Sequence, residues 1–269
     1  MLKRNTKYLQ IAFNRSLGEI AKMINLLPLS DRIIIEAGYP LIKNYGTDAI
    51  SSIRDFWYQK FFGPQEKNLS TKSFKLEMLG IPDLKDLLVK GDYFKNIFQG
   101  KISPQKSAVI DPYIVADLKC MDRAFTEVEA AKEAGAQAAT CLGLAPLETI
   151  DAFIKKCEEI KIDSFLDMLN VEYPFEVLSK LKNLPKVVML HRGVDEREDN
   201  KDKEMPYHQI ERIKGTYDDI LIAVAGGETV REAITGSFND ADIVIVWKLV
   251  NENPENIVEI TKEFLGETK

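Results

Sequence analysis

Short runs of consecutive apolar residues, rich in isoleucine and valine, alternate along the chain with longer stretches of helical period. Runs such as RIIIE, KVVML, ILIAVA and DIVIV are apolar at nearly every position, which is typical of strands covered on both faces. The pattern predicts eight strands, which begin near Leu9, Arg32, Tyr113, Gln137, Ser164, Lys186, Ile220 and Asp242. Eight strand–helix units in succession predict an α/β fold of the (β/α)8 TIM-barrel class.

Helix boundary signals fall between the predicted strands. Ser16 and Glu19 have the spacing of a capping box at a helix N-terminus. Gly135 follows the stretch EVEAAKEA as a C-terminal cap, and Pro146 suits the first turn of the helix after it. These signals support helices between successive strands.

One interval between strands is much longer than the others. Strand starts recur about every 25 residues, but the segment between Arg32 and Tyr113 holds about 55 residues more. We therefore predict one barrel domain over residues 1–269, with a helical insertion at 55–107 between the second helix and the third strand. The insertion is rich in aromatic residues, namely Phe56, Trp57, Tyr58, Phe61, Phe62, Phe74, Tyr93, Phe94 and Phe98. It is either a small appendage with its own core or an interface for oligomers or partners, since aromatic residues are enriched in interface cores.

Charge and cysteine content narrow the function classes. Lys and Arg total 36 against 42 Asp and Glu, a net charge of −6, which argues against a nucleic-acid or anionic-membrane partner. No apolar run approaches the ~20 residues of a membrane span. Cys120, Cys141 and Cys157 form neither a disulfide framework nor a zinc motif, which indicates a reducing compartment. We expect a cytoplasmic protein without a membrane or nucleic-acid partner.

Polar residues gather at the predicted C-terminal ends of the strands, where TIM-barrel enzymes hold their active sites. They are Asn14, Glu36, Asp117, Lys119, Asp122, Asp167, His191, Gly226, Gly227, Trp247 and Lys248. Asp117 and Lys119 are two residues apart at a strand end, so both point to the same face of the barrel mouth. Taken singly, each position has a structural explanation; Asp122, for example, could cap the next helix. Acidic residues at three strand ends favour a site.

The segment ADLKCMD has the spacing Asp-x-Lys-x-x-Asp at Asp117, Lys119 and Asp122, and it resembles the orotidine monophosphate decarboxylase superfamily. The segments LQIAFN, IIIEAGYPLIKNYGTDAI, FLDMLNVE, VVMLHRGVDE, IAVAGGET and ADIVIV extend the resemblance. Glu36 resembles the branch of 3-hexulose-6-phosphate synthases and 3-keto-gulonate-6-phosphate decarboxylases, which use Mg²⁺. The true orotidine decarboxylases have Lys there and need no metal.

This resemblance implies roles for the strand-end residues. Glu36 and Asp117 would bind Mg²⁺, which suits hard carboxylate oxygens completed by waters and substrate oxygens. Lys119 would stabilise an enediolate, and His191 would act as general acid and base. Asp122 would reach into the site of the neighbouring subunit of a homodimer. The substrate would be a phosphorylated sugar, bound by Asn14, Asp167, Gly226, Gly227 and Lys248.

The residues at a few positions near the motifs favour aldol chemistry with formaldehyde and ribulose 5-phosphate. Met121 before Asp122, and Met168 after Asp167, resemble the synthases. Val194 stands where the decarboxylases carry a second Arg. A related decarboxylase acting on a β-keto sugar-acid phosphate stays open as an alternative, because both reactions pass through the same enediolate.

Two positions depart from the family pattern. Asn14 replaces an Asp, which would remove an acidic neighbour of Lys119 and change its pKa. Trp247 stands where a Gly is expected, so its side chain could close a phosphate site formed by backbone amides. Lys248 would supply a point charge in place of an Arg fork. These changes leave a third hypothesis, a catalytically altered barrel that serves as a binding or assembly protein.

Overall fold

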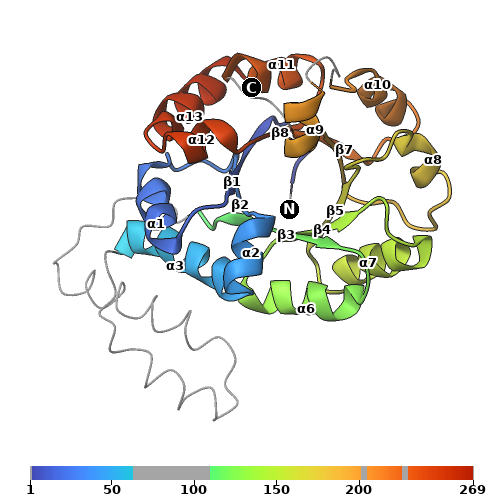
Figure 1. Cartoon of the computed structure of the whole chain (residues 1–269), viewed down its shortest axis with the longest axis horizontal. Coiled ribbons are helices and arrows are strands. Elements are labelled where there is room, and N and C mark those ends of the chain that lie inside the picture. The colour runs from blue at the N-terminus through green and yellow to red at the C-terminus, as the bar shows by residue number, and fades with distance from the viewer. Residues whose placement is uncertain (1, 63–109, 201–204, 226–229, 269) are drawn as a thin grey trace, which may run out of the picture. The chain divides into compact units, whose positions relative to one another are not determined.

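The computed structural model describes residues 2–62, 110–200, 205–225 and 230–268. Within them, eight parallel strands form a closed barrel in which each strand pairs with its neighbours in the sequence and β1 pairs with β8 (Figure 1). The strands are β1 (Tyr8–Phe13), β2 (Ile33–Ala37), β3 (Tyr113–Cys120), β4 (Ala138–Leu142), β5 (Asp163–Asp167), β6 (Val187–His191), β7 (Leu221–Ala225) and β8 (Ile243–Val246). The predicted TIM-barrel class is confirmed.

Helices surround the strands in Figure 1. Those described are α1 (Leu17–Leu26), α2 (Tyr39–Tyr45), α3 (Asp48–Phe62), α6 (Ala124–Ala134), α7 (Leu147–Glu159), α8 (Pro174–Leu178), α9 (Val194–Asp199), α10 (His208–Lys214), α11 (Val230–Phe238), α12 (Lys248–Glu252) and α13 (Asn256–Glu267). In the parts of the chain that the structure describes, every helix is too short or too polar to cross a membrane.

The helix boundaries agree closely with the sequence signals. Ser16 and Glu19 form the capping box of α1. Gly135 ends α6 with a φ of 106°, a left-handed conformation that favours glycine. Pro146 lies directly before α7 rather than within its first turn. The proposed capping role of Asp122 is wrong, because Arg123 is the N-cap of α6.

The chain divides into two compact units, Met1–Arg54 with Asp111–Lys269, and Asp55–Ile110. The first unit contains the barrel. Of the second, only residues 55–62 and 110 are described, and there Trp57 Nε1 donates a hydrogen bond to the carbonyl oxygen of Ile110 at 2.7 Å. The predicted helical character of 55–107 therefore lies mostly outside the described residues. The single-domain organisation of residues 1–269 also stays a prediction.

The core of the barrel unit has two parts. One cluster joins residues from strands on opposite sides of the barrel, including Ile34, Phe165 and Ile243, and therefore fills the interior. The other packs α6, α7 and α10 against the outer faces of the strands. All five residues of β2, β5 and β7 are buried, which is the burial on both faces that the continuous apolar runs predict. Burial of β2 and β5 therefore fixes the strand ends that carry Glu36 and Asp167.

Candidate active site

An irregularity near the end of the third strand brings Asp117 and Lys119 together. The pairing of this strand with β4 shifts register between Ala116 and Cys120, and Lys119 takes a left-handed φ of 47°. The backbone N–H of Lys119 donates to Thr140 Oγ1 at 3.0 Å, which holds this conformation from β4. As a result, Lys119 Nζ lies 3.3 Å from Asp117 Oδ2.

A second carboxylate, from β5, completes the surroundings of Lys119. Its Nζ lies 2.9 Å from Asp167 Oδ2, and Asp167 is fully buried. Burial lowers the pKa of the Lys119 amine, but Asp117 and Asp167 outweigh it and raise that pKa above its ordinary value. Lys119 is therefore a fixed ammonium. The expected effect of Asn14 on the charge balance at Lys119 stays a prediction.

His191 contacts the same Asp167 carboxylate. Its Nδ1 is 2.9 Å from Oδ1 and 3.0 Å from Oδ2, and the backbone N–H of Leu169 also donates to Oδ1 at 3.0 Å. Burial raises the pKa of Asp167, but His191 and Lys119 outweigh burial and hold it below its ordinary value. An ionised Asp167 requires a proton on Nδ1 of His191. The other ring nitrogen, Nε2, is then the one available for proton transfer.

Glu36 is a buried carboxyl at the end of β2. Gln10 Nε2, on β1, donates a hydrogen bond to Glu36 Oε2 at 2.5 Å. Burial and the nearby charge of Asp117 raise the pKa of Glu36 to about 8. The Asp117 carboxylate accepts the Thr140 hydroxyl at 2.8 Å and the backbone N–H of Tyr39 at 3.3 Å. Two carboxyl groups thus lie on the adjacent strands β2 and β3, near enough for the charge of Asp117 to affect the pKa of Glu36.

The chemistry of the donor set fits a hard cation, because Glu36 and Asp117 place two carboxyl groups on adjacent strands. Among the described residues, no group of three or more His, Cys, Asp and Glu side chains could hold a metal ion. The protein would therefore supply two carboxylates, and waters or substrate oxygens would complete the coordination. Mg²⁺ suits such a site, since it keeps several waters and commonly takes one or two carboxylates. The residues present fit the predicted Mg²⁺.

Two departures from the family pattern lie at neighbouring strand ends. The buried Oδ1 of Asn14 has no hydrogen-bond partner among the described residues, and it lies against Gly38, where an added Cβ would be 1.9 Å from it. Trp247 is partly buried and packs against the interior cluster of the barrel. Asn251 ties both positions together, because it accepts the N–H of Asn14 at 3.3 Å and donates to the Trp247 carbonyl oxygen at 2.6 Å.

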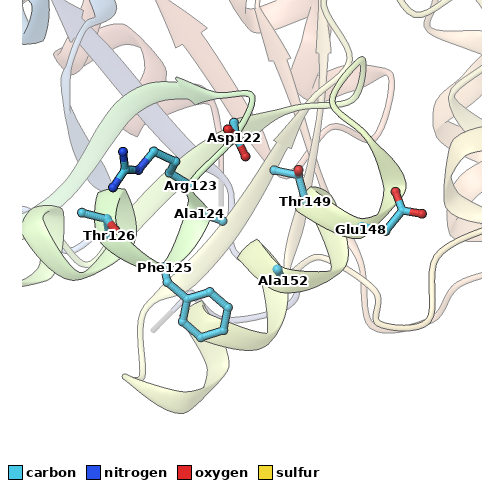
Figure 2. Close-up of a pocket in the computed structure, with 8 residues that line it drawn as sticks. All are labelled: Asp122, Arg123, Ala124, Phe125, Thr126, Glu148, Thr149 and Ala152. Atoms are coloured by element: carbon cyan, nitrogen blue, oxygen red, sulfur yellow. The ribbon is translucent and has the colours of Figure 1, made fainter.

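The remaining predicted residues lie apart from this cluster or outside the described chain. Asp122 is exposed and lines a hollow at the start of α6 and α7, shown in Figure 2. Lys248 is the first residue of α12. Gly226 and Gly227 lie outside the described residues. The structure therefore brings together Glu36, Asp117, Lys119, Asp167 and His191.

Sequence reasoning missed Gln10, Thr140 and Tyr39. Gln10 and Thr140 are fully buried, yet their strands are otherwise apolar. A polar residue inside a strand that is buried on both faces was the available signal. Tyr39 takes part through its backbone N–H and through its ring, whose centroid is 5.9 Å from Lys119 Nζ. A backbone contact leaves no such signal in the sequence.

The closed barrel and the acid–lysine–histidine cluster at its strand ends define a TIM-barrel protein with a candidate active site. The family model described as Orotidine 5'-phosphate decarboxylase / HUMPS family matches residues 111–246, about half of the chain. The chain belongs to this family.

Curated relatives and solved structures agree with this assignment. The chain is 32% identical to the Bifunctional enzyme Fae/Hps of Methanocella arvoryzae over 265 residues, covering 97% of this chain and 53% of the relative. It is 31% identical to that of Methanosarcina mazei over 260 residues, covering 96% and 52%. The chain thus spans about half the length of the curated relatives it matches.

Two solved structures share the fold. The 3-hexulose-6-phosphate synthase from Salmonella typhimurium has a TM-score of 0.66 and 19% identity, covering 96% of this chain and 99% of that one. KGPDC from Streptococcus mutans has a TM-score of 0.62 and 16% identity, covering 98% and 99%. At these identities the likeness shows the barrel fold alone.

Proposed function

We propose that the protein is an enzyme, a carbon–carbon lyase that acts on a phosphorylated ketose through an enediolate. Its reaction would be like that of 3-hexulose-6-phosphate synthase, which joins formaldehyde to ribulose 5-phosphate. The observation that carries the proposal is the ammonium of Lys119, held between Asp117 and Asp167 at 3.3 and 2.9 Å. The names of the Fae/Hps relatives and of the similar synthase structure support this chemistry.

Each residue of the cluster has a defined chemical task. Glu36 and Asp117 would hold Mg²⁺, which acts as a Lewis acid on substrate oxygens. Lys119 places a fixed positive charge where negative charge develops on the enediolate, so it lowers the barrier without rearranging. Asp167 keeps both Lys119 and His191 in place. Because Asp167 is fully buried and already contacts both, we assign it a positioning role beside the substrate contact implied by the family.

His191 would balance the protons of the reaction. Its Nε2 removes the proton from the carbon next to the ketose carbonyl, and that bond's electron pair forms the enediolate. The enediolate carbon then attacks formaldehyde, and the new alkoxide takes the proton back from His191. One proton leaves and one returns, so the imidazole ends in its starting state. The reverse sequence cleaves the hexulose phosphate.

The protein is also proposed to act as a homodimer in which Asp122 completes the neighbouring site. Phe125, which lines the hollow of Figure 2, is 46% exposed. Met121, at 44%, and Leu147, at 37%, are exposed apolar residues next in sequence to the lining residues Asp122 and Glu148. Exposed apolar groups concentrated on one surface mark interaction sites.

The three cysteines are free and buried, which agrees with the proposed cytoplasmic location.

Two variants test the shared site. An Asp122→Ala chain and a Lys119→Met chain should each be inactive alone, and a refolded mixture should regain part of the activity. The mixed dimer contains one site with both residues intact. A mixture that stays inactive while forming dimers, or a monomeric wild-type protein in sedimentation, would contradict the shared site.

The main test is a coupled assay with ribulose 5-phosphate and formaldehyde, with Mg²⁺ and with EDTA. Turnover that EDTA abolishes and Mg²⁺ restores is expected; turnover that is unaffected by EDTA contradicts the metal assignment. Lys119→Met should remove turnover. Lys214→Met is a matched control, because Lys214 Nζ lies 2.9 Å from Asp242 and 3.3 Å from Asp240, away from the cluster. It should lower stability and leave turnover in place.

Two other functions give different results in the same assay. A β-keto sugar-acid phosphate decarboxylase would release CO₂ from its substrate, and the shared fold of the KGPDC structures keeps this alternative open. A catalytically altered barrel would turn over neither substrate. The packing of Trp247 against the barrel interior favours that last alternative.

A further inference from the structure

Two neutral polar side chains lie fully buried beside the candidate metal ligands. Gln10 on β1 and Thr140 on β4 each have 0% of their surface exposed. The order β1-β2-β3-β4 places them on either side of the strands that carry Glu36 and Asp117. Each touches one of these carboxyl groups.

The buried side chain of Gln10 lowers the stability of the fold, because one of its polar atoms is unpaired. Its Nε2 donates to Glu36 Oε2, but its Oε1 has no hydrogen-bond partner among the described residues. A buried acceptor left unpaired destabilises the folded state. An apolar residue of similar size would fill this interior position without that cost. Among the described residues, the hydrogen bond to Glu36 is what the Gln10 side chain contributes.

Thr140 serves two groups with one hydroxyl. It donates to Asp117 Oδ1 at 2.8 Å and accepts the backbone N–H of Lys119 at 3.0 Å. The first bond fixes the carboxylate, and the second stabilises the left-handed backbone of Lys119, which strains a residue with a side chain. A valine of the same shape could make neither bond.

We infer that Gln10 and Thr140 are positioning residues that orient Glu36 and Asp117 to bind a divalent cation; this rests on the metal site of the proposed function. Both donors are neutral. They fix one oxygen of each carboxyl group without supplying a positive charge that would compete with the cation. Hydrogen-bonded partners of this kind set ligand orientation, and their loss typically weakens metal affinity about 10–100-fold.

Calorimetric titration with Mn²⁺ of protein treated with EDTA and dialysed tests the inference. Gln10→Met and Thr140→Val keep the volume and remove the donors, so each should weaken Mn²⁺ binding about 10–100-fold. Thr140→Ser keeps the hydroxyl and should bind Mn²⁺ nearly as well as the wild type. Ser164→Ala removes another buried hydroxyl, one near the start of β5 that accepts the N–H of Lys186, and should leave Mn²⁺ binding unchanged.

Activity at increasing Mn²⁺ separates positioning from general destabilisation. In Gln10→Met, saturating metal should restore much of kcat, while thermal unfolding shows that the barrel is intact. Thr140→Val also loses the bond to the Lys119 backbone, so saturating metal should restore its metal occupancy but only part of its kcat. If Gln10→Met does not fold, Gln10→Ala, which leaves room for water, replaces it.

The outcomes separate the two proposals. Unchanged Mn²⁺ affinity in either variant removes that residue from the role. A wild-type protein that binds no Mn²⁺ overturns both the metal site and the inference. A wild-type protein that binds Mn²⁺, loses affinity in the variants and converts no sugar phosphate overturns the proposed function alone.

Discussion

Lys119 Nζ lies 2.9 Å from Oδ2 of Asp167, a carboxylate that is fully buried. The same carboxylate also contacts Nδ1 of His191. One buried charge therefore fixes both groups that would carry out the chemistry, one as a permanent cation and one as a proton carrier. Asp167 therefore contributes both to the arrangement of the site and to the stability of the fold.

Replacing Asp167 by Asn should damage stability and activity at once. The shape is kept, but Lys119 loses a buried counter-charge, and breaking a buried pair in this way costs about 3–5 kcal/mol. Urea unfolding and steady-state turnover measure the two effects. Asp240→Asn is the control: that carboxylate pairs with Lys214 and Lys7 while 66% exposed, so its loss should cost no more than about 1 kcal/mol. Equal losses of unfolding free energy in the two variants would show that the buried pair stabilises the fold no more than the exposed pair does.

Asp167 also predicts an acid-dependent loss of stability. Burial raises its pKa, but His191 and Lys119 hold it below the ordinary value of 3.8. The unfolded chain then binds this proton more readily, so the contribution is present above pH 3.8 and is lost as pH falls through the folded-state pKa. Unfolding free energy measured from pH 6 downward should fall more steeply for the wild type than for Asp167→Asn. Parallel curves would exclude this role.

Glu36 predicts the opposite pH dependence in metal-free protein. Burial and the charge of Asp117 raise its pKa from 4.5 to about 8, so folding favours the protonated carboxyl, and stability is lost as pH rises from 4.5 through about 8. Glu36→Gln carries no such charge. In EDTA it should be more stable than the wild type at pH 8.5, with a smaller difference at pH 5. Mg²⁺ should stabilise only the wild type. A stability difference that does not vary with pH would contradict a raised pKa.

The strand framework followed from the sequence because the barrel buries both faces of each strand. Runs such as ILIAVA have no polar face, and their positions in the chain coincide with the strands found. The two-residue spacing of Asp117 and Lys119 likewise indicated that both reach the barrel mouth. Periodicity and spacing are local properties, so the sequence expresses them directly.

The internal arrangement of the site could not be derived in the same way. The left-handed backbone of Lys119 depends on the Thr140 hydroxyl from another strand, 21 residues away. The hydrogen bond from Gln10 to Glu36 also joins different strands. The second carboxylate at Lys119 likewise comes from Asp167, 48 residues away in the chain. Contacts between strands depend on register and rotamer, which no single segment encodes.

Trp247 gives a final prediction in which stability and binding change in opposite directions. Its side chain is partly buried against the interior cluster at the end of β8, so Trp247→Gly should cost up to about 3 kcal/mol of unfolding free energy. The same change exposes backbone N–H groups at a strand end followed by a short helix, where TIM barrels commonly bind phosphate.

Binding of inorganic phosphate and the KM for ribulose 5-phosphate should therefore improve in Trp247→Gly although the protein is less stable. Trp247→Phe keeps an apolar ring at the mouth, so it should lose less stability and bind phosphate as the wild type does. Calorimetry and thermal unfolding on the three proteins measure both quantities. If Trp247→Gly loses stability and phosphate affinity stays at the wild-type level, Trp247 closes no anion site and serves the packing of the barrel mouth alone.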